Sequence, residues 1–146
     1  MDRPVGIKIL SPLHAIGGMV LLFKVAFGAP NILAVILLVY LGLLALSSAI
    51  GMWLGKRWGW WLGAFFYTHT IIRHIHYLND IQAMAQYAHV TTGYLYGLLA
   101  VKVLGSLLVL GYFFRRSVVN SFQFQKFSKP RAIAILVGIS LLVGSF

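Results

Sequence analysis

The chain has 146 residues, of which 60% are hydrophobic and only 10% are charged. Globular proteins usually have about 45–50% apolar and about 25% charged residues, so a water-soluble fold is excluded. The sequence has no cysteine, which excludes disulfides, thiolate zinc sites, iron–sulfur clusters and cysteine nucleophiles. This composition predicts an integral membrane protein that crosses the bilayer several times.

Four apolar stretches are long enough to cross the hydrocarbon core, which takes about 20 helical residues. They are Val5–Phe27, Asn31–Leu54, Trp58–Leu78 and His89–Phe114. A fifth stretch, Ala132–Phe146, has 15 residues and would reach about 22 Å as a helix, which fits a thin span, a half-span or an interfacial helix. Because lipid gives the backbone no hydrogen-bond partner, spanning segments form helices. We therefore predict a single all-α domain over 1–146, a polytopic membrane helix bundle with four spans plus a short fifth hydrophobic segment.

The basic residues are unevenly distributed between the connections. The first and third connections, 28–30 and 79–88, contain no Lys or Arg. Cytoplasmic segments of membrane proteins are enriched in these residues, which predicts a cytoplasmic N-terminus in the cytoplasmic (inner) membrane. Cations there can also bind anionic lipid headgroups, so nucleic acid is not needed to explain the net charge of +10. Nine of the twelve cations precede or open the first span or lie in the second and fourth connections: Arg3, Lys8, Lys56, Arg57, Arg115, Arg116, Lys126, Lys129 and Arg131.

Two connections have amphipathic patterns. In 79–89, apolar residues recur from Ile81 at i, i+3, i+4 and i+7, and Asn79 or Asp80 precedes them in N-cap position. This pattern predicts a short helix on the outer interface. The segment 115–131 mixes apolar residues with cations and amides, which predicts a segment lying on the cytoplasmic headgroup layer. Either segment is alternatively a docking surface for another subunit.

Small residues repeat at every fourth position in two places. This spacing lets two helix backbones approach closely in a membrane. We predict that these glycines pack helices of this chain together, and a docking face for a partner is the alternative interpretation. The glycines are Gly51, Gly55, Gly59 and Gly63 around the second connection, and Gly93 and Gly97 in the fourth span.

Two of the cations inside the predicted spans are candidates for buried charges. Lys102 is near the bilayer centre, where a cation costs about 2.5–3.5 kcal/mol and usually marks a pathway, an ion pair or a partner. No Asp or Glu of the sequence shares its depth, whereas Arg73 lies within reach of Asp80. We predict that Lys102 and Arg73 are buried charges, completed by something outside this chain or used by a small transporter or channel.

Two histidines lie at matched depth in different spans. His14 and His69 are about 14 and 17 Å from the cytoplasmic ends of their helices at 1.5 Å per residue. Such a pair can ligate haem b axially, and either histidine can ligate chlorophyll magnesium. The alternative is that both are buried packing residues bonded to hydroxyls such as those of Ser11, Thr68 or Thr70.

Three further histidines lie near the predicted outer surface, where neutral imidazole can bind a metal or sense protons. They are His74, His76 and His89. Their spacing matches no strong zinc motif, and water at the interface can satisfy each ring. Interfacial histidines without a metal are the alternative.

Three short motifs resemble a family of small, uncharacterised bacterial membrane proteins with about four spans. They are RPVGI at 3–7, GG at 17–18 and GKRWGWW at 55–61. The resemblance covers the first half of the chain. It implies a prokaryotic cytoplasmic-membrane protein without an established activity, and it adds no catalytic residues.

The sequence contains no carboxylate pair, serine–histidine–acid set, phosphate-binding loop or HExxH motif, so we do not expect an enzyme. We predict a non-catalytic accessory or structural subunit that packs in the bilayer against a larger membrane protein or its own copies. The alternatives are a haem- or chlorophyll-binding subunit in electron or energy transfer through His14 and His69, and a small transporter or channel.

Overall fold

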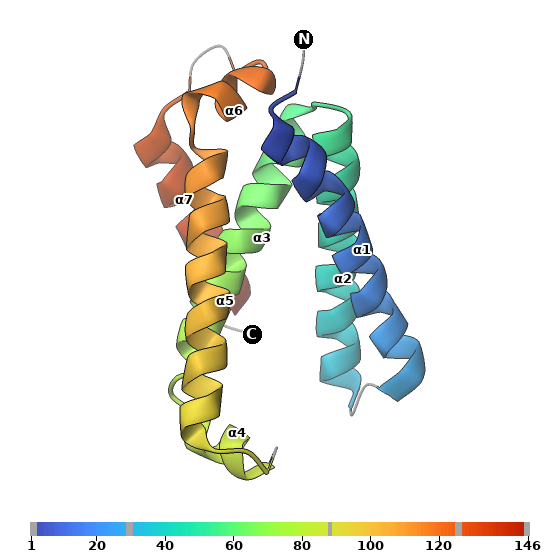
Figure 1. The fold of residues 1–146 in the computed structure, drawn as a ribbon, viewed down its shortest axis with the longest axis vertical. Helices are drawn as coiled ribbons and strands as arrows, with labels where there is room; N and C mark the ends of the chain where they lie inside the picture. Colours follow the sequence, from blue (N-terminus) through green and yellow to red (C-terminus); the bar gives the residue numbers. More distant parts are fainter. Residues whose placement is uncertain (1–2, 29–30, 88, 125–126, 145–146) are drawn as a thin grey trace. The chain divides into compact units, whose positions relative to one another are not determined.

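The computed structural model describes residues 3–28, 31–87, 89–124 and 127–144, and over these ranges it contains helices and no strand. The predicted all-α fold is confirmed, and Figure 1 shows the order of the helices. They are α1 (Val5–Gly28), α2 (Ile32–Trp53), α3 (Arg57–His76), α4 (Ile81–Tyr87), α5 (Thr92–Phe113), α6 (Arg116–Ser121) and α7 (Lys129–Gly144).

Three helices in the described ranges, α1, α2 and α5, are long and apolar enough to cross a membrane. They correspond to the first, second and fourth predicted spans. Helix α3 has 20 residues but is not in this group, because its second half contains threonines, histidines and Arg73. Helix α7 has 16 residues, about 24 Å at 1.5 Å per residue. A fourth span and a spanning fifth segment stay predictions.

The chain divides into two compact units. The first comprises Met1–Phe66 and Phe113–Phe127, and the second comprises Tyr67–Tyr112 and Ser128–Phe146. The first unit therefore contains α1, α2, the start of α3 and α6. The second contains the rest of α3 together with α4, α7 and α5 up to Tyr112, whereas Phe113 at the end of α5 belongs to the first unit.

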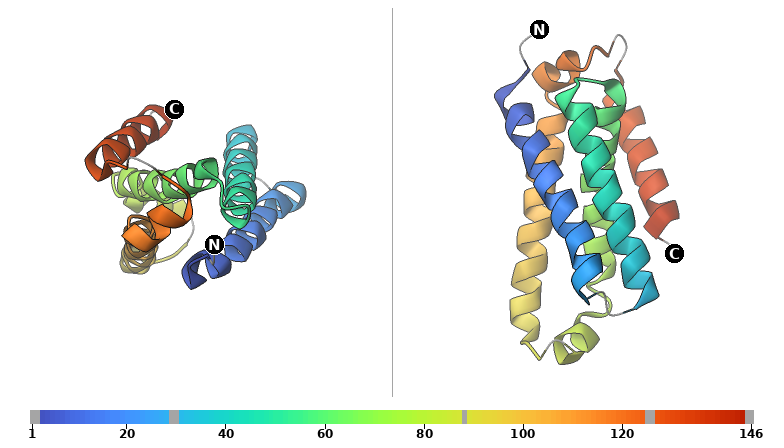
Figure 2. Two further views of the ribbon diagram at one scale, coloured as in Figure 1. Left: turned by 90° about the horizontal axis from the view of Figure 1, so that it is seen from above. Right: turned by 90° about the vertical axis from the view of Figure 1, so that its right-hand side faces the viewer.

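In the first unit, α1 and α2 run side by side in opposite directions (Figures 1 and 2). The two backbones are close at Gly18, where an added Cβ would lie 2.9 Å from the carbonyl oxygen of Gly42. Ala45 and Ala49 of α2 are buried, and the Ser11 hydroxyl donates a 2.7 Å hydrogen bond to the Ala49 carbonyl. Small side chains and a buried hydrogen bond thus hold the helix pair together. The predicted packing glycines did not include Gly18 and Gly42.

The glycines around the second connection behave as predicted for packing residues. A Cβ on Gly59 would overlap the backbone of Gly51 and Met52, and a Cβ on Gly63 would lie 2.7 Å from the Phe113 ring. Gly55 follows Leu54, the C-cap of α2, and has φ of +66°, the left-handed conformation that glycine adopts most easily. These residues let α2 and α3 approach to backbone contact.

The two glycines of α5 differ. A Cβ on Gly93 or Gly97 would meet no atom within 4 Å, and both residues are exposed. The prediction that they pack against another helix of this chain is therefore wrong for these two. The four-residue spacing is the same as in 51–63, but at Gly93 and Gly97 no described residue lies within 4 Å of an added Cβ.

The predicted helix in the third connection is present as α4. Ile81 and Ala85 are buried, and Asp80 precedes the helix, with its carbonyl accepting from the Met84 amide at 3.0 Å. Ala88, which completes the predicted apolar face, lies outside the described residues. Figures 1 and 2 show α4 across the end of α5 in the second unit.

The segment 115–131 does not present its apolar side chains to lipid. Val118, Val119 and Phe122, in and just after α6, are at most 4% exposed. They belong to the first unit, where they add to its core. The prediction that the segment lies on the cytoplasmic headgroup layer stays a prediction, and these three apolar side chains pack inside the protein.

Trp60 is the centre of an aromatic cluster in the first unit. It is 0% exposed, and its ring centroid lies 5.3 Å from Phe114, 5.3 Å from Phe124 and 5.1 Å from Phe127. Its indole Nε1–H donates to the carbonyl oxygen of Phe113 at 2.9 Å. Phe113 is the last residue of α5, so this bond satisfies a carbonyl that the helix itself leaves free.

Candidate functional site

His14 lies in a polar contact between α1 and α2. It is 5% exposed, its Nδ1 is 3.2 Å from the Ser48 hydroxyl, and its ring centroid is 5.1 Å from that of Phe66. A hydroxyl partner was predicted, but Ser48 was not among the residues considered. The sequence could have suggested Ser48, because His14 on α1 and Ser48 on α2 are similar numbers of residues from the turn that joins the two helices.

The cofactor interpretation of His14 and His69 stays a prediction. His14 belongs to the first unit and His69 to the second. A histidine that only packs in a core makes a hydrogen bond through one ring nitrogen. A histidine that ligates a metal also makes such a bond, which fixes the orientation of its ring. The Ser48 contact therefore fits either interpretation of His14.

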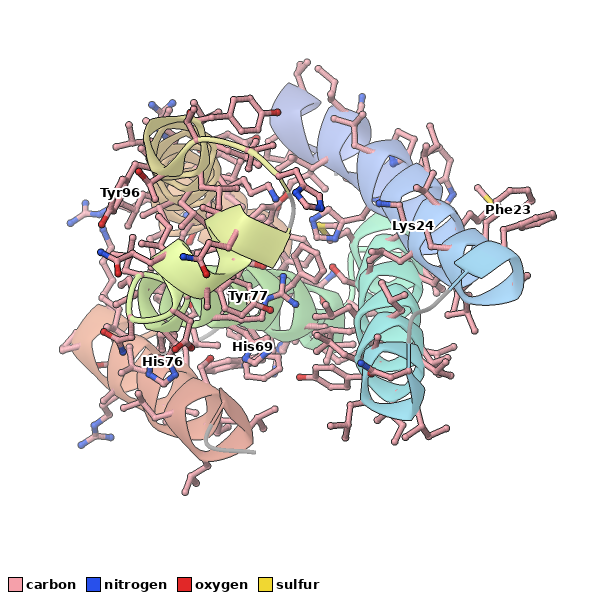
Figure 3. All side chains as sticks on the ribbon, turned by 90° about the horizontal axis from the view of Figure 1, so that it is seen from below. Phe23, Lys24, His69, His76, Tyr77 and Tyr96 are labelled. Carbon is pink, nitrogen blue, oxygen red and sulfur yellow. The ribbon has the colours of Figure 1, made fainter. Side chains whose placement is uncertain are left out.

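The second unit contains a cluster of basic side chains on α3. His69 is 3% exposed and hydrogen-bonds the backbone of Ser140 on α7, and Figure 3 shows it on α3 with Tyr77. The Arg73 guanidinium carbon is 6.0 Å from the centroid of the Tyr77 ring, a cation–π distance. The positive charge of Arg73 disfavours protonation of the imidazoles of both His69 and His74.

His74 lies on α3 one residue after Arg73. The Nδ1–H of His74 donates to the Thr70 carbonyl at 2.6 Å, and the positively charged side chains of Arg73 and Lys102 lower the tendency of this ring to take up a proton. Arg73 is half-buried, whereas Lys102 is exposed on the protein surface. Protein therefore encloses Arg73 in part and does not enclose Lys102. Burial of Lys102, as predicted, would have to come from lipid or from another protein.

The sequence makes a contact between Arg73 and Asp80 feasible. Asp80 is exposed, and the described part of the chain shows no ion pair between it and Arg73. Asp80 instead lies at the start of α4, where its backbone carbonyl accepts from Met84. The cluster of His69, Arg73, His74 and Lys102 thus carries positive charge without a carboxylate from Asp80.

The outer histidines do not assemble into a metal site. Among the described residues, no group of three or more His, Cys, Asp or Glu side chains could hold a metal ion. His74 is 5% exposed and bonded to Thr70, whereas His76 and His89 are exposed. The three residues were predicted together from sequence proximity, but the α3 helix points His74 into the protein and His76 away from it.

One face of α5 is exposed in the described part of the chain. Leu99 and Ser106 are buried on one side of the helix. On the opposite side, small and apolar residues are exposed at helical spacing. At about 100° per residue, Lys102 lies about half a turn round the axis from Gly93, so it is not on this face. The exposed residues, which we call the α5 glycine face, are Gly93, Gly97, Ala100, Leu104 and Gly111.

The chain matches no model of a known protein family. No curated protein and no solved structure matches it. The resemblance of its N-terminal half to small bacterial membrane proteins therefore stays a prediction.

Proposed function

We propose that this chain is a non-catalytic accessory subunit of the cytoplasmic membrane that packs against a larger membrane protein through the α5 glycine face. The observation that carries the proposal is that face itself. Only 11% of the apolar window of α5 is buried inside the protein, against 33% for α2. Open space lies over the glycine positions 93, 97 and 111.

Glycine has a cost in a helix that only faces lipid. It has about 1 kcal/mol less helix propensity than alanine, and it offers no side chain to pack. Small residues at this spacing are useful where another helix comes close, because they allow backbone-to-backbone van der Waals contact. The same device is used inside the chain at Gly51 and Gly59. An exposed copy of it on α5 supports a docking role.

Lys102 supports a partner independently of the glycines. It is exposed on α5, and direct contact of a mid-membrane cation with lipid costs about 2.5–3.5 kcal/mol. Within the described ranges, Lys102 makes no hydrogen bond or ion pair. A carboxylate or other acceptor on a neighbouring subunit would lower this cost.

Substituting Gly97 by leucine tests the docking face. We expect Gly97→Leu to leave the fold intact, because no atom lies within 4 Å of an added Cβ, and to block a partner helix. The protein would be purified from its native membranes in mild detergent, and stoichiometric partners would be identified by mass spectrometry. We expect the wild type to retain a partner and Gly97→Leu to lose it.

The matched control is Gly17→Leu, because Gly17 is also an exposed helical glycine with open space around it. It should retain the partner. Loss of the partner in Gly17→Leu but not in Gly97→Leu would place docking on α1 and contradict the proposal. A stable monomer that moves a solute across liposomes would favour a transporter instead.

We further propose that the N-terminus and α6 are cytoplasmic and that α4 is outside. The one-sided distribution of cations supports this orientation. The chain has no cysteine, so single cysteines can be labelled cleanly. Ala83→Cys and Asn120→Cys are suitable because both positions are exposed, whereas Ala85 of α4 is buried. An impermeant reagent added outside should label position 83 and spare position 120. The reverse pattern would refute the orientation.

A further inference from the structure

We propose that the first unit binds the phosphate group of an anionic phospholipid through Arg3, Lys56 and Arg57, which we call the headgroup site. The three cations are brought together by the turn between α2 and α3. The Nε and Nη2 atoms of Arg3 lie 3.5 and 3.9 Å from the position that a Cβ on Gly55 would take. Arg3 therefore packs on the residue that directly precedes Lys56 and Arg57.

The turn is held in place by backbone hydrogen bonds. The amide of Gly55 donates to Met52 at 3.1 Å, and the amide of Lys56 donates to Gly51 at 2.9 Å. Gly55 has φ of +66°, and its missing side chain leaves room for the guanidinium. The turn thus places the backbone of Lys56 and Arg57 directly after the residue that the Arg3 guanidinium packs on.

The charges at this turn are not neutralised by the described part of the chain. The side chains of Arg3, Lys56 and Arg57 make no hydrogen bond or ion pair with another described residue. Arg3 is half-buried and the other two are exposed. Neighbouring like charges repel one another, and a bound anion removes this repulsion. Helix α3 begins at Arg57, so the positive end of its dipole favours an anion at the same place.

The surroundings of the three cations favour a lipid over a free anion. Trp53 and Trp58, on either side of the turn, are 59% and 43% exposed, and exposed tryptophans mark the headgroup level of a membrane. Val5 of α1 and Leu54 before Gly55 are 71% and 52% exposed. A ligand with a phosphate beside apolar chains satisfies both the cations and this apolar surface. An anionic phospholipid such as phosphatidylglycerol has both parts.

Native mass spectrometry of the detergent-solubilised full chain can test the site. The protein is titrated with phosphatidylglycerol, with phosphatidylcholine and with inorganic phosphate. We expect preferential retention of phosphatidylglycerol. The triple variant Arg3→Gln/Lys56→Gln/Arg57→Gln should lose about 100-fold in apparent affinity for it, on a scale of about fivefold per cation near an anionic surface. Binding of phosphatidylcholine should not change.

The control variant Arg116→Gln/Lys129→Gln/Arg131→Gln removes the same net charge from exposed positions elsewhere in the sequence, and it should bind phosphatidylglycerol like the wild type. The triple variant changes the half-buried Arg3 and could misfold. The double variant Lys56→Gln/Arg57→Gln changes only exposed residues, and its apparent affinity for phosphatidylglycerol should still fall at least tenfold. Equal losses in the two triple variants would mean that only net charge matters, which overturns the site. Displacement of the lipid by millimolar inorganic phosphate would overturn the lipid as its ligand.

Discussion

Replacing Gly59 by alanine is expected to destabilise the protein by about 2 kcal/mol or more. A Cβ at this position would overlap backbone atoms of Gly51 and Met52, and backbone cannot turn aside as a flexible side chain can. Overpacking of this kind typically costs about 1–3 kcal/mol and occasionally more. The better helix propensity of alanine offsets about 1 kcal/mol of this cost, so the free energy of unfolding should still decrease.

Thermal unfolding in mild detergent, followed by tryptophan fluorescence and circular dichroism, measures this effect. The matched control is Gly97→Ala, because an added Cβ there meets nothing within 4 Å. Its midpoint should equal or exceed that of the wild type, since only helix propensity changes. Equal midpoints for Gly59→Ala and Gly97→Ala would show that α2 and α3 are not in backbone contact at Gly51 and Gly59.

Replacing Trp60 by alanine should have the larger effect of the two. Large aromatic to alanine changes in packed cores cost about 3–5 kcal/mol, and Trp60 is 0% exposed. The change also removes the donor to the Phe113 carbonyl. We expect residues 115–124 to lose their packing, because Phe114 and Phe124 contact the Trp60 ring. Limited trypsin digestion should then cleave after Arg115 or Arg116 much faster than in the wild type.

Two further variants separate the ring from its hydrogen bond. Trp60→Phe keeps much of the aromatic packing but leaves the Phe113 carbonyl without its donor, at a cost of about 1–3 kcal/mol. Trp53→Ala removes a tryptophan that is 59% exposed, so it should change neither the unfolding midpoint nor the cleavage rate. Slow cleavage in Trp60→Ala, as in the wild type, would contradict a role for Trp60 in holding α6.

The sequence could predict individual residues of the candidate site but not their partners. His14, His69, Arg73 and Lys102 stand out as polar residues in apolar surroundings, because burying such groups in a bilayer is costly. Their partners did not stand out. Ser48 beside His14 and Ser140 beside His69 lie on other helices, and serine is common enough in spans to carry no signal. A contact between Arg73 and Asp80 was feasible from their spacing, but Asp80 is exposed just before α4 begins at Ile81.

The sequence by itself determined the helices that can span a membrane. Length and apolarity are enough for α1, α2 and α5, because the thickness of the bilayer and the lack of backbone partners in lipid act on each segment separately. The short helix α4 was also predictable, since its apolar spacing and preceding Asp80 are local features.

Only the tertiary structure decided what each helix face does. Gly59 and Gly97 lie in two repeats with the same four-residue spacing. Gly59 is at a backbone contact, whereas an added Cβ on Gly97 meets no atom within 4 Å. Trp58 and Trp60 are two residues apart at the start of α3, yet Trp58 is 43% exposed and Trp60 is 0% exposed. Residue spacing defines the direction in which a side chain points from its own helix. Whether another segment occupies that direction depends on how distant parts of the chain pack, which no local pattern contains.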